Sequence, residues 1–253
     1  MMWYRLGEKH PHPNQDSEES RSKERSHVDC SNSSRGLFLG IIVFVAAVII
    51  LITFFVLVRT DKFMASAVRL DHLGDVSIYV VTIASVILAF HRTRGMRFSD
   101  KDQTSSFEDA LLVISLLGVF VLNVSNIIAG VLTSAKRFGH LIILSNSLEI
   151  IQGIVQTVFL LSTMHKRVWK RDQAQKKPGR EFVTFLLICN IALWGMSIFK
   201  VQRSEANPVQ EEFYGHVAWN VITHIALPFS ILFRFHSTVC LANIWKHAWK
   251  IKV

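Results

Sequence analysis

The sequence predicts an all-α membrane protein with six transmembrane helices. Half of its 253 residues are hydrophobic, and these residues come in runs of about twenty separated by charged loops. A soluble domain of this length would show amphipathic periods instead. The net charge of +9 comes from Lys and Arg in the loops, without a patch of interleaved aromatics. This pattern fits membrane topology better than nucleic-acid binding, so no nucleic-acid partner is expected.

The chain divides into a polar tail and a transmembrane domain. Residues 1–35 are rich in Ser, Glu, Lys and Arg, a composition that cannot bury apolar surface and predicts a disordered tail. The transmembrane domain is expected over residues 36–249. Its six predicted spans are 36–58, 75–90, 109–133, 140–163, 180–199 and 217–245.

The spans differ in how well they fit a bilayer. The first is unbroken by charge and opens with GLFLG, whose GxxxG spacing allows close helix packing. The second is short and would need its polar flanks or a thinned bilayer to cross. The other four are long enough to span with some tilt. Each of them carries polar residues within its apolar run.

The distribution of Lys and Arg predicts the orientation. If the N-terminus is cytoplasmic, the inner segments 1–35, 92–107, 164–180 and 246–253 hold most of the 28 basic residues. The positive-inside rule favours this arrangement. An even number of spans then puts both termini in the cytoplasm.

A polar stripe marks the fourth span. Ser145, Glu149, Gln152 and Gln156 are spaced i, i+4, i+7 and i+11, which places them on one helix face. Such a face must meet other helices or water rather than lipid. The stripe has two interpretations: Glu149 is a protonatable site on an ion path, or it is a structural acid bonded to a neighbouring helix.

The last span contains a proline and a histidine in its outer half. Pro228 removes one backbone N–H and frees the carbonyl of His224, which predicts a kink there. His224 is expected at a depth near that of Glu149. Because imidazole titrates near neutral pH, the two could relay protons. A single hydrogen bond from His224 to a helix neighbour is the alternative.

The other intramembrane polar residues have structural as well as functional interpretations. Arg234 and His236 are expected near the inner end of the last span, in a gating or structural role with Pro228. Arg234 either extends to the cytoplasmic interface or forms a fixed ion pair. Asn190 is expected to hydrogen-bond between helices, and it joins the polar groups of a possible proton path. With no nucleophile elbow, phosphate-binding Gly loop or metal-ligand spacing, the sequence predicts no enzyme, no cofactor and no metal site.

Four segments in the second half of the chain are distinctive. They are PGREFVTFLLICNIALW (178–194), EFYGHVAW (212–219), THIALPFSILFRFHSTVCL (223–241) and IWKHAWK (244–250). In this order they closely resemble the C-terminal end of otopetrins, and the resemblance extends over residues 33–250.

The resemblance implies a proton-selective channel of the plasma membrane. Otopetrins have twelve spans in two six-helix halves, cytoplasmic termini and a homodimeric assembly. This chain resembles the second half, which would form one otopetrin half-barrel bundle. In the family, a polar constriction involves a Gln, an acid and a Tyr. The acid would fall on Glu149 and the Tyr on Tyr214, while the Gln would lie in the absent half.

The implied partners are protons, the lipid bilayer and further protein chains. One half alone would expose to lipid the face that meets the other half. We therefore expect a homo-oligomer or association with another otopetrin half. The alternative function is a non-conducting structural or regulatory half that associates with a full-length otopetrin.

Overall fold

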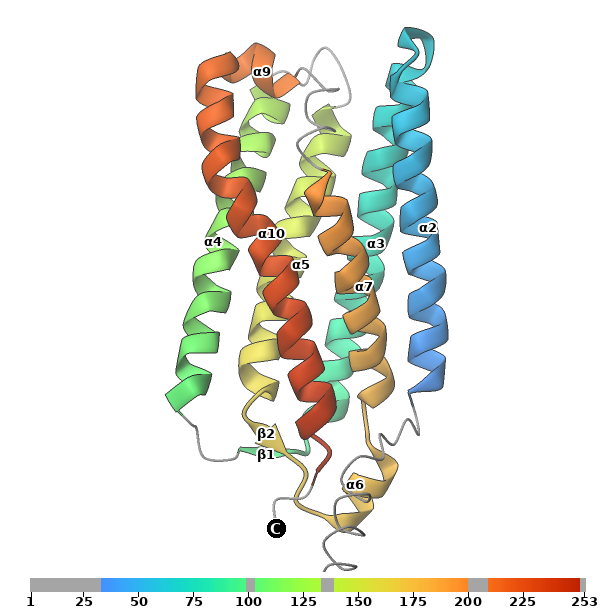
Figure 1. Cartoon of the computed structure of the whole chain (residues 1–253), viewed down its shortest axis with the longest axis vertical. Helices are drawn as coiled ribbons and strands as arrows, with labels where there is room; N and C mark the ends of the chain where they lie inside the picture. Colours follow the sequence, from blue (N-terminus) through green and yellow to red (C-terminus); the bar gives the residue numbers. More distant parts are fainter. Residues whose placement is uncertain (1–32, 99–102, 133–138, 200–208, 251–253) are drawn as a thin grey trace, which may run out of the picture. The chain divides into compact units, whose positions relative to one another are not determined.

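The computed structural model describes residues 33–98, 103–132, 139–199 and 209–250 (Figure 1). Within these ranges, six helices are long and apolar enough to cross a membrane, which confirms the predicted all-α membrane class. Most of the tail predicted to be disordered lies outside the described residues. The long helices are α2 (Ser34–Val58), α3 (Met64–Thr93), α4 (Gln103–Leu132), α5 (Gly139–Thr163), α7 (Arg180–Ile198) and α10 (His216–His247).

The second membrane helix is longer than the sequence indicated. Helix α3 has 30 residues, where a span over 75–90 was expected. The added N-terminal part carries polar residues that resembled a loop, including Asp71 and His72. The structure accommodates them because they pack inside the bundle: Asp71 is buried, and the His72 ring bonds Ser145 on α5. The helix therefore needs no thinned bilayer.

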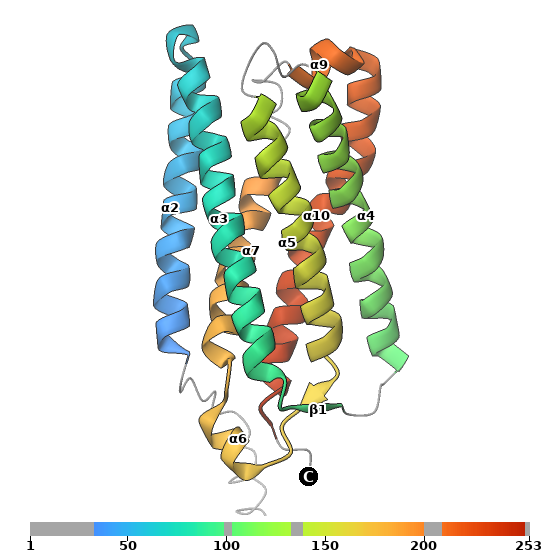
Figure 2. The ribbon, with the colours of Figure 1, turned by 180° about the vertical axis from the view of Figure 1, so that it is seen from behind.

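The six helices form a ring. Neighbours pack in the order α2, α3, α5, α4, α10 and α7, and α7 packs back against α2. Consecutive long helices run in opposite directions (Figures 1 and 2). Helices α5 and α10 are not adjacent in this order but still touch across the ring, as α3 and α7 do. Side chains that join α5 to α10 or to α7 therefore lie in the interior of the ring.

The GxxxG spacing of α2 marks its contact with α7. A Cβ on Gly36 would lie 1.9 Å from the carbonyl oxygen of Glu181, and one on Gly40 would lie 2.8 Å from Cβ of Ile188. Both glycines are buried, whereas most of α2 exposes large apolar side chains such as Phe38. Small residues thus let the two backbones approach closely while the rest of α2 faces outward.

Short elements close one end of the bundle. Strands β1 (Arg97–Phe98) and β2 (Lys166–Arg167) pair antiparallel and join the segments after α3 and α5. The Arg97 guanidinium stacks 4.0 Å from the Trp169 ring centroid. Helix α6 (Arg171–Lys176) follows β2, and Trp249 donates a hydrogen bond to the Pro178 carbonyl (3.1 Å). The turn η1 (Asp61–Phe63) and helix α9 (Val209–Tyr214) precede α3 and α10 at the opposite end (Figure 1).

We predict that Gly36→Ala lowers the thermal unfolding midpoint of the purified chain in detergent. Its Cβ would overlap the α7 backbone, and overpacking of this kind costs about 1–3 kcal/mol. Gly195→Ala in α7 is the control, because a Cβ there meets nothing within 4 Å. This change should be neutral or stabilise by up to about 1 kcal/mol. Equal changes in midpoint for the two variants would contradict the packing of α2 on α7.

Candidate functional site

The polar stripe of α5 faces the interior of the ring. Glu149 is 2% exposed, and Gln152 and Gln156 are fully buried. Apolar residues on the opposite face of α5, such as Ile151 and Val158, are exposed. The helix therefore turns its polar side to the other helices and its apolar side outward, the orientation that a bilayer requires.

A buried ion pair joins α5 to α10 across the ring. The Arg234 Nη2 atom lies 3.3 Å from Oε1 of Glu149, and the two side chains are 0% and 3% exposed. Nη1 of Arg234 donates to Oε1 of Gln152 (2.5 Å). The guanidinium also lies 5.6 Å from the Tyr79 ring centroid and 5.4 Å from that of Phe233. The buried positive charge thus has a carboxylate, an amide and two aromatic faces around it.

Of the two interpretations of Arg234, the ion pair is the one observed. The Arg234 side chain is fully buried and bonds to Glu149 and Gln152, so its guanidinium is held inside the bundle.

Side-chain amides continue the network from α5 to α7. Nε2 of Gln152 donates to Oε1 of Gln156 (2.6 Å), and Nε2 of Gln156 donates to Oδ1 of Asn190 (2.8 Å). Nδ2 of Asn190 donates back to Oε1 of Gln156 (3.1 Å) and to the Leu186 carbonyl (2.9 Å). The amide groups thereby satisfy one another away from water, which is the condition for burying them.

Helix α3 adds titratable groups to the same interior. Nδ1 of His72 lies 2.9 Å from Oγ of Ser145, one turn before Glu149 on α5. Asp75 is 9% exposed and lies on the α3 face that also carries His72 and Tyr79, because the three are spaced by three and four residues. Since His72 contacts α5 and Tyr79 lies beside Arg234, Asp75 faces the ring interior between these contacts.

Some side chains of the network can bind and release protons, whereas others can only form hydrogen bonds. His72, Asp75 and Glu149 can each bind or release a proton, whereas Gln and Asn amides donate and accept hydrogen bonds without titrating. The Arg234 guanidinium offers only hydrogen-bond donors and no acceptor. Within the described ranges, no three His, Cys, Asp or Glu side chains gather as possible metal ligands. The arrangement suits proton binding and the orientation of water.

Comparison with known proteins identifies the family. The family model described as Otopetrin matches residues 1–235. The proton channel OtopLc of Drosophila melanogaster is 38% identical over 233 residues, covering 92% of this chain and 15% of that protein. The chain belongs to the otopetrin family.

Two less similar relatives are also named proton channels. The human proton channel OTOP3 is 24% identical over 83% of this chain and 43% of its own length. The mouse proton channel OTOP2 is 24% identical over 83% of this chain and 48% of its own length. The chain therefore spans less than half the length of these curated relatives.

In this otopetrin chain, His224 does not join Glu149. Its side chain is exposed, and its Nδ1 donates to the Asn220 carbonyl one turn earlier (2.7 Å). The reason is helical phase: His224 precedes the buried Ala226 by two residues, or about 200° around α10. The predicted relay between His224 and Glu149 is therefore absent from the structure. Helix α10 changes direction in its first half, which contains Pro228 (Figure 1).

Tyr214, which ends α9 just before α10, and His236, in the second half of α10, both bond to α4. The Tyr214 hydroxyl donates to the Ser125 carbonyl (3.0 Å), and its ring stacks on Trp219 at 6.0 Å. Burial raises the pKa of the Tyr214 phenol, so it stays protonated and acts as a donor. His236 is 8% exposed and donates from Nε2 to the Glu108 carbonyl (3.0 Å).

Sequence reasoning missed the contribution of α3. His72 was assigned to a loop, and Asp75 to the edge of the second span. One signal could have revealed them: Asp71, Asp75 and Tyr79 recur at four-residue spacing, as one helix face does. A helix continued upstream of residue 75 places this face against α5.

We predict that Glu149→Gln and Arg234→Gln each strongly destabilise the bundle. Removing one partner leaves the other charge buried and unpaired, which costs about 3–5 kcal/mol. The double variant should lose less stability than the sum of the two, a coupling measurable from unfolding midpoints in detergent.

Asp172→Asn is the control for this double-mutant cycle. It removes the exposed ion pair with Lys176, whose side chains are 66% and 75% exposed, and such pairs contribute at most about 1 kcal/mol. Additive effects of Glu149→Gln and Arg234→Gln would show that the two side chains do not act as a pair.

Proposed function

We propose that this chain is one half of an otopetrin proton channel and conducts protons across the plasma membrane. The observation that carries the proposal is the polar interior of the ring. Glu149, Arg234, Gln152, Gln156 and Asn190 form one hydrogen-bonded network between helices that are not neighbours in the ring. The otopetrins to which the chain is similar are named proton channels.

Charged groups at this depth carry a cost that a purely structural bundle avoids. Apolar side chains of similar volume would hold the helices together at least as well, because replacing a buried ion pair in this way is often neutral or stabilising. Intramembrane ionisable residues therefore mark ion and proton pathways by default. This argument favours the protonatable interpretation of Glu149 over the structural one.

The proposed path uses the titratable groups in order along the ring interior. An incoming proton binds at His72 or Asp75 and passes to Glu149, through water where side chains are too far apart. Protonation of Glu149 cancels its charge and weakens its attraction to Arg234. Gln152, Gln156 and Asn190 then orient water beyond this point without storing charge.

The proposed assembly follows from topology. Both termini lie in the cytoplasm, as the positive-inside rule favours, and the chain crosses the membrane six times. Its proposed partner is a further chain, either a copy of itself or another otopetrin half, because one half alone would expose to lipid the face that meets the other half. Tyr214 and His224 then lie near the outer mouth, and Pro228 and His236 shape α10.

Proton currents test the proposal. We expect an inward current when the outer pH of a cell expressing the chain is stepped to about 5, either with the chain alone or with a co-expressed N-terminal otopetrin half. Glu149→Gln should reduce this current at least about tenfold, since it removes a proton-binding group. Glu212→Gln, a change of an exposed acid on α9, should leave it unchanged.

Surface labelling must accompany the currents. If neither pairing conducts while the chain is present at the cell surface, conduction by this chain is wrong. Equal currents from Glu149→Gln and the native chain would instead remove Glu149 from the path.

A second candidate is a non-conducting half that regulates a full-length otopetrin. The ion pair that Glu149 already forms with Arg234 favours it. We then expect co-expression to change the current or surface level of a full-length otopetrin and the two chains to co-purify. Unchanged currents without co-purification would exclude this function.

A further inference from the structure

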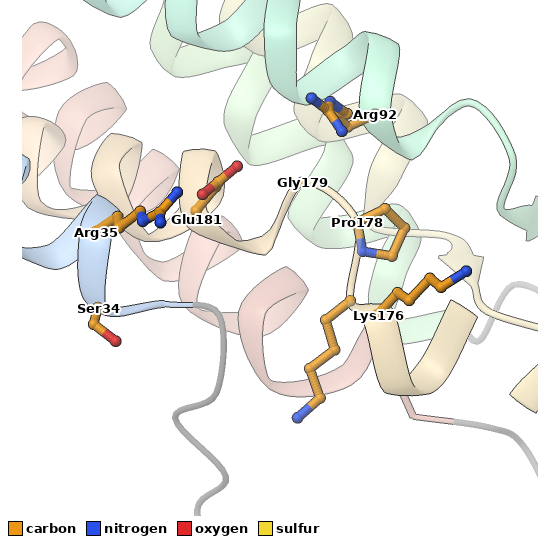
Figure 3. Close-up of a pocket in the computed structure, with 8 residues that line it drawn as sticks. Ser34, Arg35, Arg92, Lys176, Pro178, Gly179 and Glu181 are labelled. Carbon is orange, nitrogen blue, oxygen red and sulfur yellow. The ribbon is translucent and has the colours of Figure 1, made fainter. Parts of the chain in front are cut away.

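A pocket lies where three membrane helices end. It has a volume of about 380 Å³, within the range of roughly 300–1,000 Å³ found for ligand sites. Its walls come from the start of α2, the end of α3, and the turn between α6 and α7 (Figure 3). The lining residues are Ser34, Arg35, Arg92, Lys176, Lys177, Pro178, Gly179 and Glu181.

The pocket is strongly basic. Four of the lining side chains are cations, Arg35, Arg92, Lys176 and Lys177, against the single carboxylate of Glu181. The salt bridges found among the described residues do not involve Arg35 or Arg92. Lys176 shares an exposed ion pair with Asp172 (3.1 Å). Concentrated positive charge in a hollow favours a polyanionic ligand.

The backbone between α6 and α7 shapes this pocket. Lys177 and Gly179 adopt positive φ angles of 43° and 81°, which turn the chain sharply after α6. A Cβ on Gly179 would lie 3.0 Å from Cβ of Arg92, so glycine lets this turn sit directly against α3. No side chain caps the N-terminus of α7, and the positive end of that helix adds to the field of the four cations.

The surroundings identify the ligand as a lipid rather than a soluble anion. One turn beyond Arg35, Phe38 and Leu39 on α2 are 67% and 55% exposed. One turn before Arg92, Leu88 on α3 is 48% exposed. A basic hollow at the end of membrane helices, with apolar side chains directly below, offers one surface for a headgroup and another for acyl chains.

We propose that this pocket binds the phosphorylated headgroup of an anionic membrane lipid of the phosphoinositide type. Arg35 and Arg92 contact the phosphates through their guanidinium groups, which match phosphate geometry in a two-pronged fashion. Lys176 and Lys177 contribute positive charge from the opposite wall, and the carboxylate of Glu181 lowers the net positive charge of the pocket. The site goes beyond proton conduction, and binding can be measured whether or not the chain conducts.

Lipid binding to the purified full chain tests the proposal. Native mass spectrometry in detergent, with dioctanoyl phosphatidylinositol 4,5-bisphosphate as probe, should show saturable binding that dioctanoyl phosphatidylcholine does not compete for. Arg35→Gln and Arg92→Gln should each weaken binding about fivefold, since one basic residue near a membrane surface contributes about 1 kcal/mol. Glu181→Gln should strengthen it, because a like charge is removed.

Arg94→Gln is the matched control. Arg94 is exposed at the same end of α3 but does not line the pocket, so its removal should leave the affinity unchanged. If Arg92→Gln and Arg94→Gln weaken lipid binding equally, the effect comes from general surface charge and the proposed site is wrong. Binding of inositol 1,4,5-trisphosphate as tight as that of the lipid would make it a site for soluble phosphates. Absence of saturable lipid binding would also overturn it.

Discussion

Two opposite charges that must be buried together govern the arrangement of this bundle. Glu149 and Arg234 lie on helices that do not adjoin in the ring, and neither charge can stay in an apolar interior without the other. Their contact therefore fixes the rotation of α5 and of α10 about their axes. Once these rotations are set, Gln152 meets Arg234 and Gln156 meets Asn190.

The part of the site that was predictable is the part that depends on spacing within one helix. Glu149, Gln152 and Gln156 share a face at any rotation of α5, so the sequence alone placed them together. The partner of Glu149 could not be found in this way, because it depends on how α10 is rotated and how deeply Arg234 lies. Estimates of depth alone favoured His224, whose side chain is exposed and bonds to the Asn220 carbonyl of its own helix.

The fold was predictable to the extent that hydropathy reflects membrane contact. Helix α2, which exposes apolar residues over most of its surface, was assigned nearly to the residue. Helix α3 was predicted too short because the low hydropathy of its buried polar residues made them resemble a loop. Asp71, His72 and Asp75 are helical because neighbouring helices, rather than lipid, surround them. The burial of these polar residues thus explains both why the predicted span was too short and why α3 is of functional interest.

The contact between α4 and α10 has a mechanical consequence. A Cβ on Gly118 of α4 would lie 2.2 Å from Cβ of Phe229 and 2.9 Å from the Ala226 carbonyl, so α4 lies directly against the segment around Pro228. A proline leaves the helix without one backbone hydrogen bond and makes it easier to bend there. Tyr214 bonds to Ser125 of α4 before this segment, and His236 bonds to the Glu108 carbonyl of α4 after it. Helix α4 therefore braces α10 on both sides of Pro228 and opposes bending of α10 there.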